Sequence, residues 1–257
     1  MIGAIAGDII GSIYEWNNIK TKDFNLFSAD CFFTDDSILT IALAEAILSD
    51  ADYAQLLRQY YHRYPNAGYG GMYRRWAVSD NLEAYNSWGN GAAMRISSVG
   101  FAFDNLGDVL ANAKTYTEIT HSHPEGIKGA QATASIIYLA RMGENKAFIK
   151  EFVETEFGYD LSLTLDEIRP SYTFDESCQG TVPQAITALL ESNNFEDAIR
   201  NAISLGGDSD TLACITGGMA EAYYGGVPRY IAGQAMSYLD DILKEVVMGF
   251  YSRYGRL

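Results

Sequence analysis

The apolar positions of this chain follow a helical period along most of its length. Residues 37–48 are apolar around most of a helix circumference, which predicts a buried helix. Residues 52–64 are more amphipathic and stop before Pro65, a helix breaker. Further helical patterns cover 126–143, 195–207, 211–226 and 230–254. The most strand-like stretch, 161–165, is short and isolated, so we expect an all-α, compact multi-helix fold.

The length and composition indicate one ordinary domain. The 257 residues contain no repeat, linker or low-complexity segment, so we expect a single domain over 1–257. No apolar run approaches the ~20 residues that a bilayer requires. The apolar N-terminal segment is a poor signal peptide, because it lacks a basic stretch and contains Asp8. We therefore expect a cytoplasmic protein without a membrane partner. Cys31, Cys178 and Cys214 are scattered, which favours buried free thiols over disulfides or a zinc site.

The net charge of −15 changes this picture in two ways. Such a field repels phosphate backbones and argues against general nucleic-acid binding. Part of the excess negative charge is also consistent with carboxylates that gather around divalent cations. The sequence does not define the oligomeric state.

Two segments place aspartates and a threonine in a turn directly before an apolar helix. One begins at Phe33 (FTDDSILT) and the other at Gly206 (GGDSDTLA). Helix capping explains one such residue in each turn, but each turn has three. Asp35 and Asp36 are adjacent and can face two different ions. Asp208 and Asp210 point to a similar side if their turn is extended.

A third group of carboxylates lies near the N-terminus. Asp8 and Glu15 are seven residues apart, which on a helix is two turns and one face. If Glu15 meets the four aspartates, repulsion between them opposes ionisation unless cations are present. Oxygen ligands without nearby His or Cys select magnesium, manganese or calcium. The three groups together therefore favour a metal site.

Five segments also resemble the ADP-ribosylglycohydrolases in sequence and in order. They are GDIIGSIYE, FTDDSILT, SWGNGAAMR, THSHPEGIKGAQATA and GGDSDTLACITGGMAEAYYG, and the resemblance covers residues 3 to about 226. That family includes enzymes that remove ADP-ribose from arginine or serine. The resemblance implies a compact all-α fold with two divalent cations, Mg²⁺ or Mn²⁺, in a central cleft. Its metal ligands correspond to Thr34, Asp35, Asp36, Asp208, Asp210 and Thr211.

The resemblance also implies roles in catalysis and substrate binding. Glu15, with Asp35 and Asp210, corresponds to the catalytic group beside the metals. Trp88 is positioned to stack on adenine, although tryptophan is more often a core residue, and Arg95 is free to pair with a carboxylate. The turn at Gly70 and Gly71 either lines the cleft or is only a turn. The substrate-binding positions implied are Tyr69, Gly70, Gly71, Ser87, Trp88, Gly89, Asn90, Gly91 and His121.

The expected function is a metal-dependent hydrolase that cleaves the bond between the distal ribose of ADP-ribose and a modified target. The target is an ADP-ribosylated protein side chain such as Arg or Ser, and free ADP-ribose is a product. Glu15 acts either as the base toward water or as the acid toward the leaving group. Two alternatives stay open: a hydrolase of small-molecule or nucleic-acid-linked ADP-ribose conjugates, and a non-catalytic, crystallin-like or ADP-ribose-binding protein.

Overall fold

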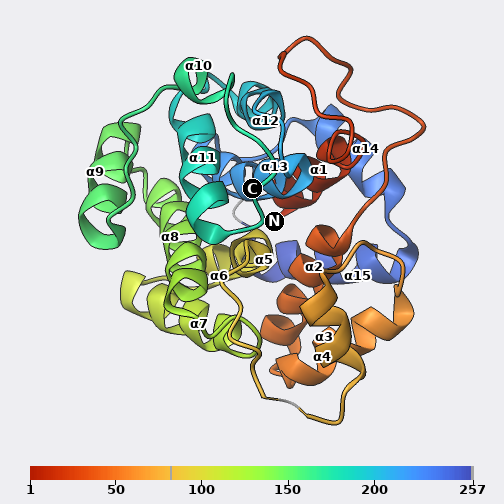
Figure 1. The fold of residues 1–257 in the computed structure, drawn as a ribbon. Coiled ribbons are helices and arrows are strands. Elements are labelled where there is room, and N and C mark those ends of the chain that lie inside the picture. Colours follow the sequence, from red (N-terminus) through yellow and green to blue (C-terminus); the bar gives the residue numbers. More distant parts are fainter. Residues whose placement is uncertain (82, 256–257) are drawn as a thin grey trace.

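The computed structural model describes residues 1–81 and 83–255, which form helices and loops without any β-strand (Figure 1). The all-α prediction is therefore confirmed. The only strand-like pairing within these ranges is an isolated bridge between Gly89 and Ser177. No helix of the described residues is long and apolar enough to cross a bilayer. The helices are α1 (Ile2–Gly11), α2 (Asp35–Ser49), α3 (Tyr53–Arg63), α4 (Gly71–Val78), α5 (Gly91–Met94), α6 (Ser97–Ala102), α7 (Leu106–Glu118), α8 (Pro124–Arg141), α9 (Lys146–Phe157), α10 (Leu165–Ile168), α11 (Cys178–Leu190), α12 (Phe195–Ser204), α13 (Ser209–Tyr223), α14 (Arg229–Tyr238) and α15 (Asp241–Tyr254).

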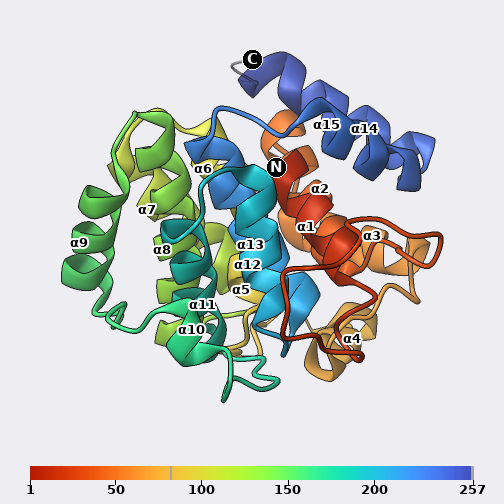
Figure 2. The same ribbon diagram turned by 90° about the horizontal axis from the view of Figure 1, so that it is seen from above.

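Helices α1 and α13 pack against each other at the centre of the molecule (Figures 1 and 2). Gly3, Gly7 and Gly11 recur every four residues, so they share one face of α1. A Cβ atom at Gly3 would lie 2.2 Å from the carbonyl oxygen of Gly217, and one at Gly7 would lie 2.0 Å from that of Ala213. The two backbones therefore touch, and this contact brings the carboxylates of α1 and α13 together.

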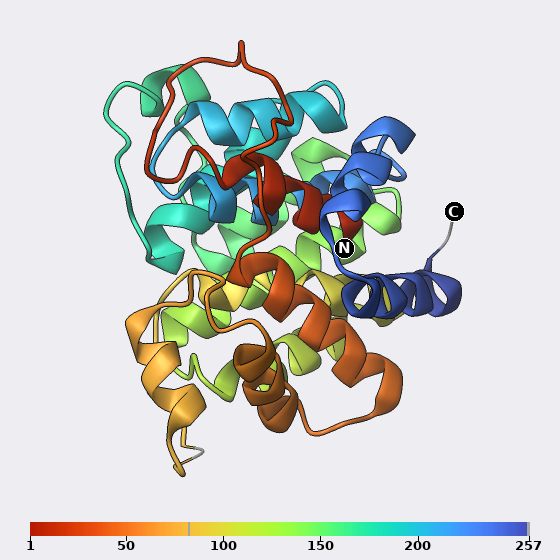
Figure 3. The ribbon, with the colours of Figure 1, turned by 90° about the vertical axis from the view of Figure 1, so that its right-hand side faces the viewer.

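The other helices surround this central pair. Helices α8, α11 and α12 pack against α13, while α2 packs against α1 and is covered by α3 and α15. The long connection between α1 and α2, residues 12–34, extends over the outside of the central helices (Figure 3). The starts of α2 and α13 meet beneath this connection, and the candidate site is built there.

Two of the predicted elements differ from the structure. The predicted helix 230–254 is two helices, because Asp240 caps the start of α15 by accepting a hydrogen bond from the Leu243 amide (2.9 Å). The stretch 161–165 is an irregular segment that leads into α10, and Thr164 caps that helix. In both places a capping side chain sets a boundary that the apolar pattern does not show.

The N-terminal helix ends earlier than the Asp8–Glu15 spacing predicts. Helix α1 stops at Gly11, and the chain turns away immediately afterwards. A Cβ atom at Gly11 would lie 2.4 Å from the Asp210 Cα, so the end of α1 lies directly on α13. The prediction that Asp8 and Glu15 share one helical face is wrong, and Glu15 instead lies in the turn after α1.

Candidate functional site

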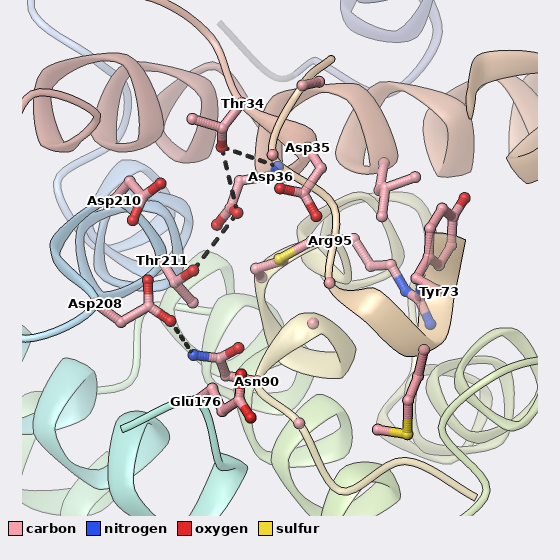
Figure 4. Close-up of a pocket in the computed structure, with 18 of the residues that line it drawn as sticks. Thr34, Asp35, Asp36, Tyr73, Asn90, Arg95, Glu176, Asp208, Asp210 and Thr211 are labelled. Atoms are coloured by element: carbon pink, nitrogen blue, oxygen red, sulfur yellow. Dashed lines mark hydrogen bonds between the residues drawn. The ribbon is translucent and has the colours of Figure 1, made fainter. Parts of the chain in front are cut away.

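A cavity of about 570 Å³ opens between the starts of α2 and α13, the loop before α4 and the segment 85–91. Figure 4 shows its wall, with the carboxylates of α2 and α13 grouped at one end and Arg95 beside Tyr73 at the other. The two segments with aspartates and a threonine, distant in sequence, face each other across this end of the cavity.

Residues of α1 and α2 satisfy the free backbone amides at the start of α2. Thr34 is the N-cap, and its hydroxyl accepts a hydrogen bond from the Asp36 amide (3.2 Å). Asp8 accepts bonds from the amides of Thr34 (2.9 Å) and Ser37 (3.0 Å) and from both of their hydroxyls. Because Thr34 and Asp8 provide the cap, the carboxylates of Asp35 and Asp36 are free for another role.

The start of α13 is capped differently. Asp208 occupies the N-cap position, yet its side chain makes no capping bond and instead accepts from Asn90 Nδ2 (2.7 Å). The Thr211 hydroxyl lies 3.5 Å from Asp36 Oδ2, which connects the two helix starts (Figure 4). Helix capping therefore does not account for the carboxylates at this position.

Two oxygens in this cluster are buried without a partner. Asp36 Oδ1 and Asp210 Oδ1 have no hydrogen-bond partner among the described residues. Carboxylate oxygens lie within 4.8 Å of one another in two groups, Asp8–Asp36–Asp210 and Glu15–Asp208–Asp210. Burial, followed by the charges of Asp8 and Asp35, raises the pKa of Asp36 well above its usual range. No Lys or Arg within the described ranges forms an ion pair with this cluster.

These features fit divalent cations. The donor set consists only of oxygens, which suits Mg²⁺ or Mn²⁺. Asp210 belongs to both groups and is suited to bridge two ions. Asp8 differs from the others because its two oxygens already accept four hydrogen bonds, so it holds Thr34 in place.

Asp35 points to a different side from Asp36. Its amide donates to the Ala67 carbonyl (2.6 Å), and its carboxylate faces Gly68, where a Cβ atom would lie 3.2 Å from Oδ1. It belongs to neither carboxylate group. Burial, with the charges of Asp8 and Asp208, raises the pKa of Asp35 to about 8.

Glu15 reaches the cluster from the turn after α1. Burial and then the charge of Asp208 raise its pKa to about 7. Asn18 holds this turn against the α13 loop, donating to the Gly207 carbonyl (2.9 Å) and accepting from the Gly207 amide (2.8 Å). Lys20 Nζ also donates to the carbonyls of Tyr172 (2.6 Å) and Leu205. Sequence reasoning missed both residues, because neither lies in a motif and their partners are distant backbone atoms.

The segment from Ser87 to Gly91 lines the cavity together with His121. Trp88 is 43% exposed, so it is not a core residue. The amides of this turn are only partly available. The Gly89 amide donates to Ser87 Oγ and the Asn90 amide to the Glu176 carbonyl, whereas the amides of Trp88 and Gly91 have no partner among the described residues.

The remaining predicted positions divide between the cavity wall and the core. Gly70 and Gly71 line the cavity, and Gly70 is the N-cap of α4. Tyr69 is buried behind this wall, where its ring stacks on Tyr73 at 5.2 Å, and it does not line the cavity. The possible pairing of Arg95 with a carboxylate is not found among residues 1–81 and 83–255, where its guanidinium bonds to Thr120 and His121.

Comparisons with known proteins agree with this architecture. The profile of the ADP-ribosylglycohydrolase family matches residues 1–255. The chain is 25% identical to mouse ADP-ribosylhydrolase ARH3, over 88% of this chain and 82% of that protein. It is 26% identical to ADP-ribosylarginine hydrolase Tri1 of Pseudomonas putida (strain GB-1), over 88% of this chain and 69% of that protein.

A solved structure described as an ADP-ribosylglycohydrolase-related protein complex has the same fold. It superposes with a TM-score of 0.74 over 98% of this chain and 97% of that chain, at 22% identity. With a family profile that matches almost every residue, the chain belongs to the ADP-ribosylglycohydrolase family.

Proposed function

We propose that this protein hydrolyses the glycosidic bond between the distal ribose of ADP-ribose and a modified target, releasing ADP-ribose. The main supporting observation is the pair of unpartnered, buried carboxylate oxygens of Asp36 and Asp210 at one end of a cavity lined by Ser87–Gly91. The family membership of the chain supports the same chemistry.

Two divalent cations, Mg²⁺ or Mn²⁺, fit the carboxylate end of the cavity. Asp210, which belongs to both carboxylate groups, would hold them together with side chains from the starts of α2 and α13. When bound, such ions stabilise developing negative charge and orient water and ribose hydroxyls. The ligands proposed are Thr34, Asp35, Asp36, Asp208, Asp210 and Thr211.

The side chains of this end serve hydrolysis at the ribose C1 atom. Water adds to that carbon through a transition state resembling an oxocarbenium ion, while the bond to the target nitrogen or oxygen breaks. Glu15 takes the proton that the water loses and donates a proton to the departing nitrogen or oxygen, because a carboxyl group with a pKa of about 7 exchanges protons readily near neutral pH. Asn18 and Lys20 keep Glu15 beside Asp208.

An exposed aromatic pair at the mouth of the cavity favours a planar, cationic target. Trp16 follows Glu15 in the chain, is 77% exposed and stacks on Phe174 with 5.4 Å between ring centroids. Both rings line the cavity. A guanidinium group is planar and cationic, and it stacks on aromatic faces. We therefore propose arginine-linked ADP-ribose as the preferred substrate.

Product analysis tests the reaction. The protein is incubated with ADP-ribosyl-arginine, ADP-ribosyl-serine and ADP-ribosylated nucleic acid, with Mg²⁺, with Mn²⁺ or with a chelator. We expect free ADP-ribose, produced only with the metals. AMP as the product would instead indicate pyrophosphate cleavage, and no product from any substrate would favour the non-catalytic alternative.

Substitution of the aromatic pair tests the target. Trp16→Ala should lower kcat/KM for ADP-ribosyl-arginine about 5- to 30-fold, since a cation–π contact contributes about 1–2 kcal/mol. Phe148→Ala, which removes an exposed ring of α9 outside the cavity, is the matched control. Equal activity of Trp16→Ala and the parent on the arginine substrate would contradict this assignment.

A further inference from the structure

Arg95 is a buried cation without a counter-charge in the described part of the chain. Its side chain is only 1% exposed, and it forms no ion pair with a carboxylate of residues 1–81 or 83–255. Its Nη1 atom is buried without a hydrogen-bond partner in these ranges. An uncompensated buried charge destabilises a protein, and Arg95 lines the cavity, so an anion bound there would compensate it.

The contacts of Arg95 determine which nitrogen of His121 has the proton. Arg95 Nη2 lies 3.1 Å from His121 Nδ1 and 2.5 Å from the Thr120 hydroxyl, which itself lies 2.8 Å from Nδ1. A guanidinium only donates hydrogen bonds, so Nδ1 must accept. Burial and the charge of Arg95 also lower the pKa of His121, which keeps the ring neutral. A neutral ring that accepts at Nδ1 has its proton on Nε2.

The Nε2 atom faces the glycines of the Ser87–Gly91 segment. A Cβ atom at Gly91 would lie 3.1 Å from Nε2, and one at Gly89 would lie 3.7 Å from it. Glycine at position 91 therefore leaves the N–H group uncovered. The amides of Gly89 and Asn90 already have acceptors within the protein, so the Nε2–H group of His121 adds a donor beside the few amides that remain for a ligand.

We propose that Arg95 is a positioning residue that holds His121 as an Nε2–H donor toward the diphosphate of ADP-ribose. The diphosphate in turn supplies the counter-charge that Arg95 lacks. This inference rests on the proposed function, because it takes ADP-ribose as the ligand of the cavity.

Nitrogen NMR of the His121 ring tests the tautomer without any ligand. The parent should show a neutral ring protonated at Nε2. Arg95→Met should shift the ring toward a mixture of tautomers, because the Thr120 hydroxyl can either donate or accept. Arg75→Met is the control, since it removes a cation that lines the cavity but makes no bond to His121. A parent ring protonated at Nδ1 would overturn the proposal.

Calorimetry with ADP-ribose and with adenosine, which lacks phosphate, tests the role of the charge. Arg95→Met should bind ADP-ribose about 10- to 100-fold more weakly than the parent, which is the range for loss of a hydrogen bond to a charged group. Its affinity for adenosine should equal that of the parent. Arg95→Lys should retain more ADP-ribose affinity than Arg95→Met. The ligand-free melting temperature of Arg95→Met should equal or exceed that of the parent, whereas a purely structural role would lower it.

The outcomes separate this inference from the proposed function. If the parent does not bind ADP-ribose, the proposed function is wrong. The NMR experiment still tests the tautomer of His121, because it needs no ligand. If the parent binds ADP-ribose and Arg95→Met binds it equally well, the role of Arg95 is wrong.

Gly91→Ala gives an independent test that leaves Arg95 in place. The new methyl group would lie against Nε2 without altering the contacts of Nδ1. We expect the His121 tautomer to stay as in the parent, with ADP-ribose affinity about tenfold lower through loss of one hydrogen bond. Unchanged affinity would show that Nε2 does not reach the ligand.

Discussion

Each end of the cavity has charged groups without partners of the opposite sign, and the sign differs between the ends. At the starts of α2 and α13, carboxylates crowd together and two acceptor oxygens, Asp36 Oδ1 and Asp210 Oδ1, have no donor within the described ranges. At the other end the Arg95 guanidinium has a buried donor without an acceptor in those ranges. Cations at one end and an anion at the other would each supply the missing opposite charge. The proposed ADP-ribose, bound beside divalent cations, would meet both requirements.

The ends also differ in how they are built. The carboxylates extend from helix starts whose relative position is set by backbone contact between α1 and α13. The opposite wall is an irregular segment held by a few isolated bonds, such as that of the Asn90 amide to the Glu176 carbonyl and that of the Asn90 side chain to Asp208. We therefore expect substitutions at the first end to alter metal binding and catalysis, and those at the second to alter ligand affinity.

Asp210→Asn should produce the largest effect, because Asp210 belongs to both carboxylate groups. We expect the loss of kcat/KM to exceed the about 10²–10⁴-fold that acid–base catalysis contributes, with partial recovery in excess metal. Steady-state kinetics measure the loss of kcat/KM, and calorimetry measures the affinity for the metal. Asp241→Asn, another aspartate in the first turn of a helix, is the control and should behave as the parent. Normal metal binding by Asp210→Asn would refute the bridging role.

Glu15→Gln should separate proton transfer from metal binding. Glutamine keeps the volume and hydrogen bonds of Glu15 but cannot exchange the proton. We expect turnover to fall about 10²–10⁴-fold while ADP-ribose affinity and the melting temperature stay close to those of the parent. If Glu15→Gln turns over at the parental rate on a confirmed substrate, another group moves the proton.

Trp88→Ala should weaken ADP-ribose binding without changing metal affinity. Stacking of a base on an aromatic ring contributes about 1–3 kcal/mol, so we expect a Kd about 5- to 150-fold higher. Phe148→Ala again serves as the control. Equal affinity of Trp88→Ala and the parent would mean that adenine lies elsewhere.

The metal-free protein should lose stability as the pH rises. The folded-state pKa values of Glu15 (about 7) and Asp35 (about 8) exceed those of the unfolded chain, so the folded state retains protons that the unfolded state has lost. The stability that this retention provides is complete below about pH 4 and is lost as the pH rises toward 8.

Melting curves of the chelated protein between pH 5 and 8 measure this decline. Mg²⁺ at 100 times its Kd should restore about 2.7 kcal/mol, or roughly 5–10 °C. Metal-free Asp36→Asn should show a shallower decline than the parent, because one acid of the cluster is absent. A melting temperature that rises with pH in the chelated parent would contradict the crowding of charges at this end.

Several features of the fold and the site were predictable from local patterns. The apolar periodicity of residues 37–48 and 211–226 identified the helices α2 and α13, because burial of one helix against another requires apolar side chains at a helical spacing. The aspartates before these helices indicated a metal site, since one capping residue would have been sufficient. The ordered motifs indicated the family.

Other features depended on contacts between distant segments, which no local pattern contains. The end of α1 at Gly11 follows from its contact with α13, and the place of Glu15 depends on the bonds of Asn18 to Gly207. The burial of Arg95 without a carboxylate likewise appears only when α5 packs beside His121. The sequence by itself thus indicated several of the main helices and determined which residue types are present. The tertiary structure alone decided which charges meet, because electrostatic interactions depend on distance and burial rather than on position along the chain.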